Sequence, residues 1–305
     1  MMMVKLKGLM FLVLVLVAVT GCTSNDPALE DLPAPEATRN PSQDMKQSTA
    51  PADPDPTSDV IGLHGYVQNL YKLDKFIQEK NAVQRIVLYT IEGDPIFYTL
   101  EYTKEGSIHV QYDTRKDHFG SKEVLNYTCS SLDRTEADNR LAYELTDCKD
   151  GYSESGKISL IQLDYQRFNK GKPFDFRFEY GVNNNILILI DTREQKLDVK
   201  VSSDVNKSVS DFQLREKDMK LIYKEAVNQG LLWDQDNNEE TVTCNKKPHE
   251  SYKLTLYKDD NTYPYEWNEC DKNNQNLTIL KNAIMGVLQK DKIYEKITED
   301  MLYVE

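Results

Sequence analysis

Residues 23–58 constrain the fold most, because this stretch cannot contribute to a hydrophobic core. It holds seven of the eleven prolines of the 305-residue chain and no aromatic residue. A segment with so few large apolar side chains cannot offset the entropy cost of folding, so it is predicted to be disordered. A folded body must therefore come from the roughly 247 residues that follow, enough for one large domain or two ordinary ones.

The first 21 residues have the three-part pattern of a secretory signal peptide. Lys5 and Lys7 give a positive start, Gly8–Val19 is a continuous apolar run, and small residues follow. The apolar run is about a dozen residues long, whereas a membrane-spanning helix needs roughly 20. We therefore expect a cleaved signal rather than a permanent membrane span.

The signal ends in Val19, Thr20, Gly21 and Cys22, a sequence that resembles a bacterial lipobox. The resemblance implies that a diacylglyceryl group is attached to the Cys22 sulfur and that the chain is cut before Cys22. Two acyl chains suffice for stable anchoring, so the protein is expected on the outer face of the cell membrane. Residues 22–58 are then a tether for the folded body. An ordinary signal peptide with an incidental cysteine remains the alternative.

The net charge of the chain limits its partners. It is −13, and it becomes about −15 once the two signal lysines are removed. Nucleic-acid binding needs a basic footprint, so nucleic acid is excluded as a partner. The expected partners are the membrane, through the lipid on Cys22, and an unknown extracytoplasmic protein or small ligand.

Four cysteines remain if Cys22 is lipidated, and an exported location permits disulfides. Four cysteines allow three pairings. The local pairing, Cys129–Cys148 with Cys244–Cys270, fits the spacing best, and on the chain-entropy model each bond contributes roughly 3 kcal/mol. A structural zinc site is the competing hypothesis, but such sites usually contain close Cys-x-x-Cys pairs, and none is present.

Short alternating segments separated by turn signals predict an α+β fold for residues 59–150. A helix is expected over Val67–Glu79, because its apolar residues are spaced for one face. Strands joined by short turns favour an antiparallel meander packed by that helix. The expected strands are Ala82–Thr90, Ile96–Tyr102, Ser107–Asp113, Glu123–Leu132 and Arg140–Cys148.

Residues 151–305 are expected to form a second α+β domain. Phe174–Tyr180 alternates as a half-buried strand does, and further strands are expected in Asn185–Asp191 and from Lys196 onward. A helix follows Ser210 or Asp211, with Gly230 as its C-terminal cap. The remaining expectations are a hairpin of Tyr252–Tyr257 with Tyr263–Cys270 and a last helix over Leu277–Leu288. The segment around residues 157–168 is a further candidate strand.

Four segments carry a family resemblance. They are "DVIGLHGYVQNLYKLDKFI", "VLYTIEGDPIFYTLEY", "YDTRKDHFGS" and the pair "YTC…YELTDC". Over residues 59–148 they resemble a domain family of unknown function found in lipoproteins of spore-forming Gram-positive bacteria. The two family cysteines fall on Cys129 and Cys148, which implies the local disulfide. The resemblance implies no activity and no catalytic residues.

The best candidate for a binding site is a polar cluster after the third expected strand. Asp113, Arg115, Asp117 and His118 lie in "YDTRKDHFGS", and binding residues gather on loops. A charged turn without a binding role is the alternative. His64 is expected in a turn, His109 on the exposed side of a strand, and His249 in a lysine-rich loop.

Known catalytic and metal motifs are missing from the sequence. There is no P-loop, no Gly-x-Gly-x-x-Gly, no His-Glu-x-x-His and no Ser-x-x-Lys. Asp234–Glu240 starts like a calcium loop, but position 6 is Glu239 instead of glycine and position 12 is Asn245 instead of glutamate. We therefore predict no catalytic residue, no metal site and no cofactor.

These observations favour a lipid-anchored, non-enzymatic interaction module. One alternative is an extracytoplasmic hydrolase that acts on envelope material with scattered carboxylates and histidines. The other is a module like those that inhibit proteases, suggested by the "YKLTLY…W" hairpin. The sequence does not decide between them.

Overall fold

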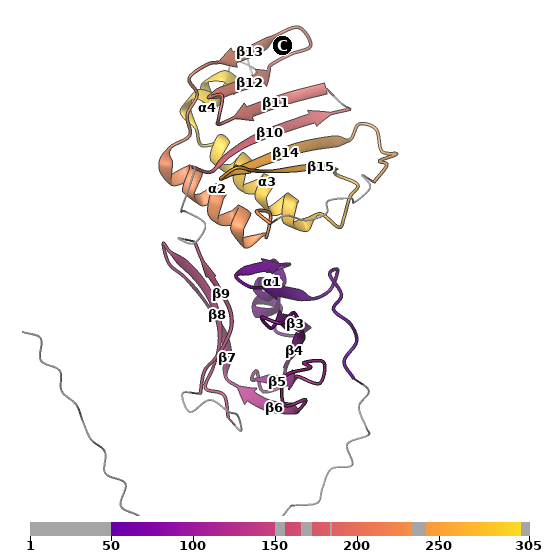
Figure 1. The fold of residues 1–305 in the computed structure, drawn as a ribbon. Helices are drawn as coiled ribbons and strands as arrows, with labels where there is room; N and C mark the ends of the chain where they lie inside the picture. The colour runs from indigo at the N-terminus through magenta and orange to yellow at the C-terminus, as the bar shows by residue number, and fades with distance from the viewer. Residues whose placement is uncertain (1–49, 150–155, 166–172, 184, 234–241, 300–305) are drawn as a thin grey trace, which may run out of the picture. The chain divides into compact units, whose positions relative to one another are not determined.

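The structure is a computed structural model that describes residues 50–149, 156–165, 173–183, 185–233 and 242–299. Cys22, the signal peptide, most of the tether and Asp234–Glu240 lie outside these residues. The described residues form four helices and fifteen strands in three sheets (Figure 1). The predicted α+β class is confirmed. No helix among the described residues is long and apolar enough to cross a membrane.

Sheet A has six strands in the order β2-β1-β3-β4-β5-β6. Only β1 and β3 are parallel, and every other neighbouring pair is antiparallel. Strands β3 to β6 follow one another in both chain and sheet, which is the predicted meander. The bounds are β1 Val60–Leu63, β2 Tyr66–Gln68, β3 Val83–Tyr89, β4 Pro95–Tyr102, β5 Ile108–Asp113 and β6 Val124–Cys129.

The helix predicted over Val67–Glu79 begins later than expected. Helix α1 spans Tyr71–Glu79, and Val67 lies in β2 instead. The turn between β1 and β2 consists of His64 and Gly65, both with positive φ, as a type I′ hairpin turn requires. This hairpin holds Tyr66–Gln68 in the sheet, so pairing with β1 outweighs the helical spacing of the sequence.

Sheet B has three antiparallel strands in the order β7-β8-β9. The predicted strand Glu123–Leu132 is in fact two strands, because the chain leaves sheet A at Ser130 and enters sheet B. Strand β9 lies beyond residue 150, where the sequence suggests a domain boundary, and pairs with β8. The bounds are β7 Ser131–Glu136, β8 Arg140–Thr146 and β9 Ile158–Asp164.

Helix α1 contacts both of these sheets. Phe76 of α1 stacks on Tyr102 of sheet A with ring centroids 4.7 Å apart. Tyr143 of sheet B donates a hydrogen bond to Asp74 Oδ1 of α1 at 2.7 Å. The helix therefore covers the inner face of sheet A, where side chains such as Leu100 and Ile108 are fully buried.

Sheet C is six-stranded and antiparallel, in the order β13-β12-β11-β10-β14-β15. Its strands are β10 Asp175–Val182, β11 Asn185–Asp191, β12 Lys196–Lys200, β13 Asn206–Val209, β14 Glu250–Lys258 and β15 Asn261–Asn268. The helices that accompany it are α2 Glu216–Asn228, α3 Gln275–Leu288 and α4 Lys292–Glu299. Gly230 follows α2 with φ 69°, in the predicted role of a left-handed terminator.

Both predicted local disulfides are present. Cys129–Cys148 joins cysteines 19 residues apart, and Cys244–Cys270 joins cysteines 26 apart. The first bond connects the end of β6 in sheet A to the segment after β8 in sheet B, beside the bridge between Thr128 and Lys149.

Candidate functional site

The predicted site residues lie at one end of sheet A, around the loop from Thr114 to Glu123 between β5 and β6. Thr114 and Glu123 close the base of this loop. The Thr114 N–H donates to the Glu123 carbonyl at 3.0 Å, and the Glu123 N–H donates to Thr114 Oγ1 at 3.0 Å. The loop therefore continues the antiparallel pairing of its two strands and projects from a fixed base.

Asp113, which is buried, and Arg115, which is partly exposed, form an ion pair at the start of the loop. Asp113 Oδ1 accepts the Arg115 backbone N–H at 3.0 Å, and Asp113 Oδ2 accepts Arg115 Nη2 at 2.6 Å. Asp113 is 3% exposed. Burial acts to raise the pKa of Asp113, but the hydrogen bonds and charge of Arg115 together lower that pKa below its ordinary value. The carboxylate is thus an acceptor that shapes the loop.

Asp117 holds the tip of the loop. Its Oδ1 accepts the backbone N–H groups of Phe119 at 2.9 Å and Gly120 at 3.0 Å. A Cβ atom added at Gly120 would lie 2.4 Å from Asp117 Oδ2. A larger residue at this position would therefore force the capping carboxylate to shift and weaken its two hydrogen bonds.

His118 connects this loop to the turn between β3 and β4, residues 90–94. Its Nδ1 lies 2.8 Å from Asp94 Oδ1, and its backbone N–H donates to Asp94 Oδ2 at 2.9 Å. The hydrogen bonds from His118 lower the pKa of Asp94. We call the turn 90–94 and the loop 114–123 the joined loops.

Each of the joined loops exposes one large apolar side chain. Phe119 is 79% exposed and Ile91 is 89% exposed. Sequence reasoning missed both residues because it searched for polar and titratable groups. The signal was nevertheless present: Phe119 stands in the polar run "KDHFGSK", and Ile91 precedes the turn "EGD".

The structure brings together some of the predicted site residues but not all. Asp113 pairs with Arg115, whereas Asp117 bonds its own turn and His118 bonds Asp94. No group of three or more histidine, cysteine, aspartate or glutamate side chains suited to a metal ion occurs among the described residues. The four cysteines other than Cys22 are all in disulfides.

The other three histidines lie at separate positions in the fold. His64 lies in the β1–β2 turn with φ 43°. His109 is exposed on β5, as predicted. Nδ1 of His249 lies 3.0 Å from the Lys246 carbonyl oxygen. None of these positions is joined to the loop that carries His118 by a described hydrogen bond.

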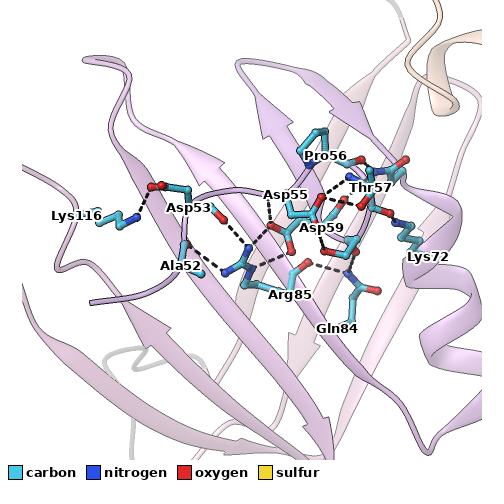
Figure 2. A network of polar contacts seen from close by, with 12 residues as sticks. Ala52, Asp53, Asp55, Pro56, Thr57, Asp59, Lys72, Gln84, Arg85 and Lys116 are labelled. Atoms are coloured by element: carbon cyan, nitrogen blue, oxygen red, sulfur yellow. Dashed lines mark hydrogen bonds and ion pairs between the residues drawn. The ribbon is translucent and has the colours of Figure 1, made fainter. Parts of the chain in front are cut away.

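Residues 50–59, which we call the strap, are fastened to the unit formed by sheet A and α1 (Figure 2). Residues 50–54 lie against the outer face of sheet A, the face opposite α1, through Arg85 and Lys116. Asp59, 2% exposed, receives Arg85 Nε at 2.8 Å and Arg85 Nη2 at 2.6 Å. The sequence assigns residues 50–58 to a disordered tether, whereas the structure fixes them, because side chains of the body donate hydrogen bonds to the carbonyls of this segment.

The second half of the strap, residues 55–59, has its carbonyls taken by side chains of the body. Asn69 Nδ2 donates to the Pro56 carbonyl at 2.7 Å and to the Asp59 carbonyl at 2.8 Å. Asp55 accepts hydrogen bonds from the side chains of Thr57 and Ser58 and from the Thr57 N–H, which lower its pKa to about 2. Lys72 also donates to the Thr57 carbonyl.

The first half of the strap, residues 50–54, reaches the joined loops. Arg85 Nη2 donates to the Asp53 carbonyl at 2.9 Å, and Arg85 Nη1 donates to the Ala52 carbonyl at 3.2 Å. The Asp53 carboxylate pairs with Lys116 of the β5–β6 loop at 2.5 Å. Figure 2 shows this half lying between Lys116 and Arg85. The strap and the candidate binding loop are therefore in direct contact.

Sheet C has a cavity of about 430 Å³ beside its short edge strand β13. Its apolar lining includes Ile186, Leu187, Leu189 and Val205, and its polar lining includes Asp198. Asp198 is engaged with Lys196 at 2.8 Å and with the Ser208 hydroxyl at 2.5 Å. The Asp198 carboxylate is therefore already paired with side chains of sheet C.

A comparison with protein families finds a match over the region that contains the joined loops. Residues 57–144 match the model of a family described as a domain of unknown function, DUF4362. The unknown-function family expected from residues 59–148 is thereby confirmed, and the match includes the joined loops and the last three residues of the strap. No curated protein and no solved structure matches the chain significantly.

Proposed function

We propose that this protein is a membrane-anchored extracytoplasmic lipoprotein whose folded body is a non-enzymatic interaction module. The contact surface is the pair of joined loops, and the partner is another extracytoplasmic protein. The anchor is the lipid on Cys22, supported by the charge, apolar and small-residue pattern that precedes it.

The observation that carries this proposal is that the aspartates of the joined loops form hydrogen bonds within the loops. Asp113, Asp117 and Asp94 each accept hydrogen bonds that fix the loops themselves. Fixing the loops leaves Phe119 and Ile91 displayed to solvent at defined positions. Large apolar side chains held within polar surroundings are the kind of residue that anchors a protein contact.

A crosslinking experiment in living cells tests the proposed surface. The tethered protein is crosslinked and its partners are identified by mass spectrometry. Phe119→Ser and Ile91→Ser should each remove the main partner while leaving the unfolding midpoint unchanged. Val83→Ser is the matched control, because Val83 is 60% exposed at the opposite end of β3 from the turn that carries Ile91. Equal loss in all three variants, or in none, would count against the joined loops.

The anchor has its own test. Cys22→Ala should leave the precursor uncleaved and without label from radioactive palmitate. Label retained on the variant would refute anchoring through Cys22, independently of the binding result. Hydrolysis of envelope material by the purified protein would favour the hydrolase alternative.

A further inference from the structure

Three cations on strand β3 and the β5–β6 loop are each paired with an aspartate, and two of them, Arg85 and Lys116, lie over the Phe97 ring on the outer face of sheet A. Arg85 pairs with Asp59 and Arg115 with Asp113, both at 2.6 Å. The side chains of Asp59 and Asp113 are only 2% and 5% exposed. Removing either carboxylate would leave a cation without its buried partner, so these two pairs are permanent parts of the fold.

The third pair is different, because its aspartate comes from the strap and is open to solvent. Lys116 pairs with Asp53 at 2.5 Å, and the Asp53 side chain is 93% exposed while Lys116 is 25% exposed. The Lys116 ammonium lies 5.8 Å from the centre of the Phe97 ring. The cation is thus held in place by the sheet, whereas its carboxylate partner can leave into water.

The two halves of the strap differ in the same way. Residues 55–59 are held by the buried Asp59 carboxylate, by Asn69 and by the internal bonds of Asp55. Residues 50–54 are held by two Arg85 hydrogen bonds to carbonyls and by the exposed Lys116 pair. Exposed ion pairs shift an equilibrium only slightly, so the first half can detach while the second half stays.

We propose that Lys116 is a carboxylate-binding site that Asp53 occupies within the chain, and that an acidic side chain of a partner protein replaces Asp53 there and frees residues 50–54. This inference rests on the proposed interaction surface, because Lys116 and Phe119 belong to the same loop. The ligand is an acidic segment that also carries an apolar residue. Its carboxylate forms an ion pair with Lys116, and its apolar side chain contacts Phe119.

The mobility of the strap provides a direct test. A nitroxide is attached at Ala50→Cys in the full chain carrying Cys22→Ser, and its spectrum gives the mobile fraction of the strap. The probes are two capped peptides, Glu-Glu-Phe-Glu-Glu and Gln-Gln-Phe-Gln-Gln. The acidic peptide at millimolar concentration should raise the mobile fraction by up to about fivefold, the range expected for an exposed pair. The glutamine peptide should leave it unchanged.

Two lysine variants sharpen the result. Lys116→Gln should raise the mobile fraction without peptide by a similar factor and abolish the response to the acidic peptide. Lys122→Gln removes the same charge from an exposed position of the same loop and should change neither. The proposal is overturned if Lys116→Gln leaves the mobile fraction unchanged. It is also overturned if this variant responds to the acidic peptide as strongly as the unsubstituted protein does.

The two proposals fail separately. A partner that is lost with Phe119→Ser in cells, combined with a strap that ignores Lys116 and the acidic peptide, would leave the interaction surface standing and remove only the exchange at Lys116. A strap that responds as expected, without any crosslinked partner, would leave the exchange standing as an isolated property of the folded body.

Discussion

Sheets A and C have the same number of strands, yet their outer faces are built differently. On sheet A, neighbouring strands place Ile61, Val87 and Phe97 in register, and all three are at most 6% exposed. On sheet C, the corresponding face carries charge pairs, such as Lys253 with Glu266 at 3.2 Å across β14 and β15.

The difference shows how a strap changes what a sheet face can contain. An apolar row on an open face would be exposed to water, so it needs a cover. The Arg85 guanidinium lies 5.4 Å from the centre of the Phe97 ring and binds the strap as well. Sheet C has fewer apolar side chains in a row on this face, because Arg177 and Glu179 pair with each other there and the apolar Leu189 lies opposite Glu179 and Asp198.

The largest effect is expected from removing the aromatic ring of Phe97, which Arg85 covers. Phe97→Ala should lower the free energy of unfolding by about 3–5 kcal/mol, because Phe97 is 1% exposed and a cavity would remain. Ile186→Ala in sheet C is the control. Ile186 is 48% exposed, so its loss should cost less than about 1 kcal/mol. Urea unfolding measures both, and equal losses would contradict the contrast between the two sheets.

The next effect concerns the arginines of the two outer faces. Arg85→Met should cost about 3 kcal/mol, because Asp59 would remain buried without its cation. Arg177→Met in sheet C should cost less than about 1 kcal/mol, because Arg177 is 36% exposed and Asp191 keeps the Arg193 and Glu194 N–H groups. Chemical denaturation of both variants measures whether the Arg85–Asp59 pair contributes more to the free energy of unfolding than the pairs of Arg177.

Two glycine substitutions should have opposite signs. Gly120→Ala should destabilise by about 1–2 kcal/mol, because the new Cβ collides with Asp117 in the joined loops. Gly286→Ala should stabilise by about 0.5–1 kcal/mol, since Gly286 lies inside helix α3 with nothing within 4 Å of the added atom. Thermal unfolding measures both, and a stable Gly120→Ala protein would argue against a rigid loop.

The smallest effect is the acid sensitivity of the strap. The folded-state pKa of Asp55 is lowered from 3.8 to about 2, so its stabilising contribution is complete above pH 4 and is lost as the pH falls towards 2. Asp55→Asn should therefore flatten the decline of stability in that window. Asp204→Asn changes an exposed carboxylate of the sheet C region and serves as the control. Identical acid profiles for the two variants would remove Asp55 from the explanation.

The predictable parts of the fold were those that depend on near neighbours in the chain. The meander, both disulfides and the helix before Gly230 follow from alternation, spacing and turn residues. The β1–β2 hairpin was missed because its turn, His64-Gly65, lies inside a pattern that is also compatible with a helix. Hairpin pairing prevailed there over a spacing that suits both structures.

The site was only partly predictable, because its contacts join residues far apart in sequence. Asp94 and His118 are 24 residues apart, Asp59 and Arg85 are 26 apart, and Asp53 and Lys116 are 63 apart. A local pattern located Asp113 to His118 as a polar loop but gave no sign of these partners. Whether this loop binds a partner stays a prediction.

The strap also determines how the body responds to force. A pull along the N-terminal chain reaches Asp53 and Asp59 before it reaches β1, so the load enters sheet A through Lys116 and Arg85 as well as through the backbone. Strand β1 lies between β2 and β3 rather than at an edge, so it cannot be peeled away one residue at a time from the side of the sheet. Tension should therefore detach the Lys116 contact first and leave the sheet intact behind Asp59.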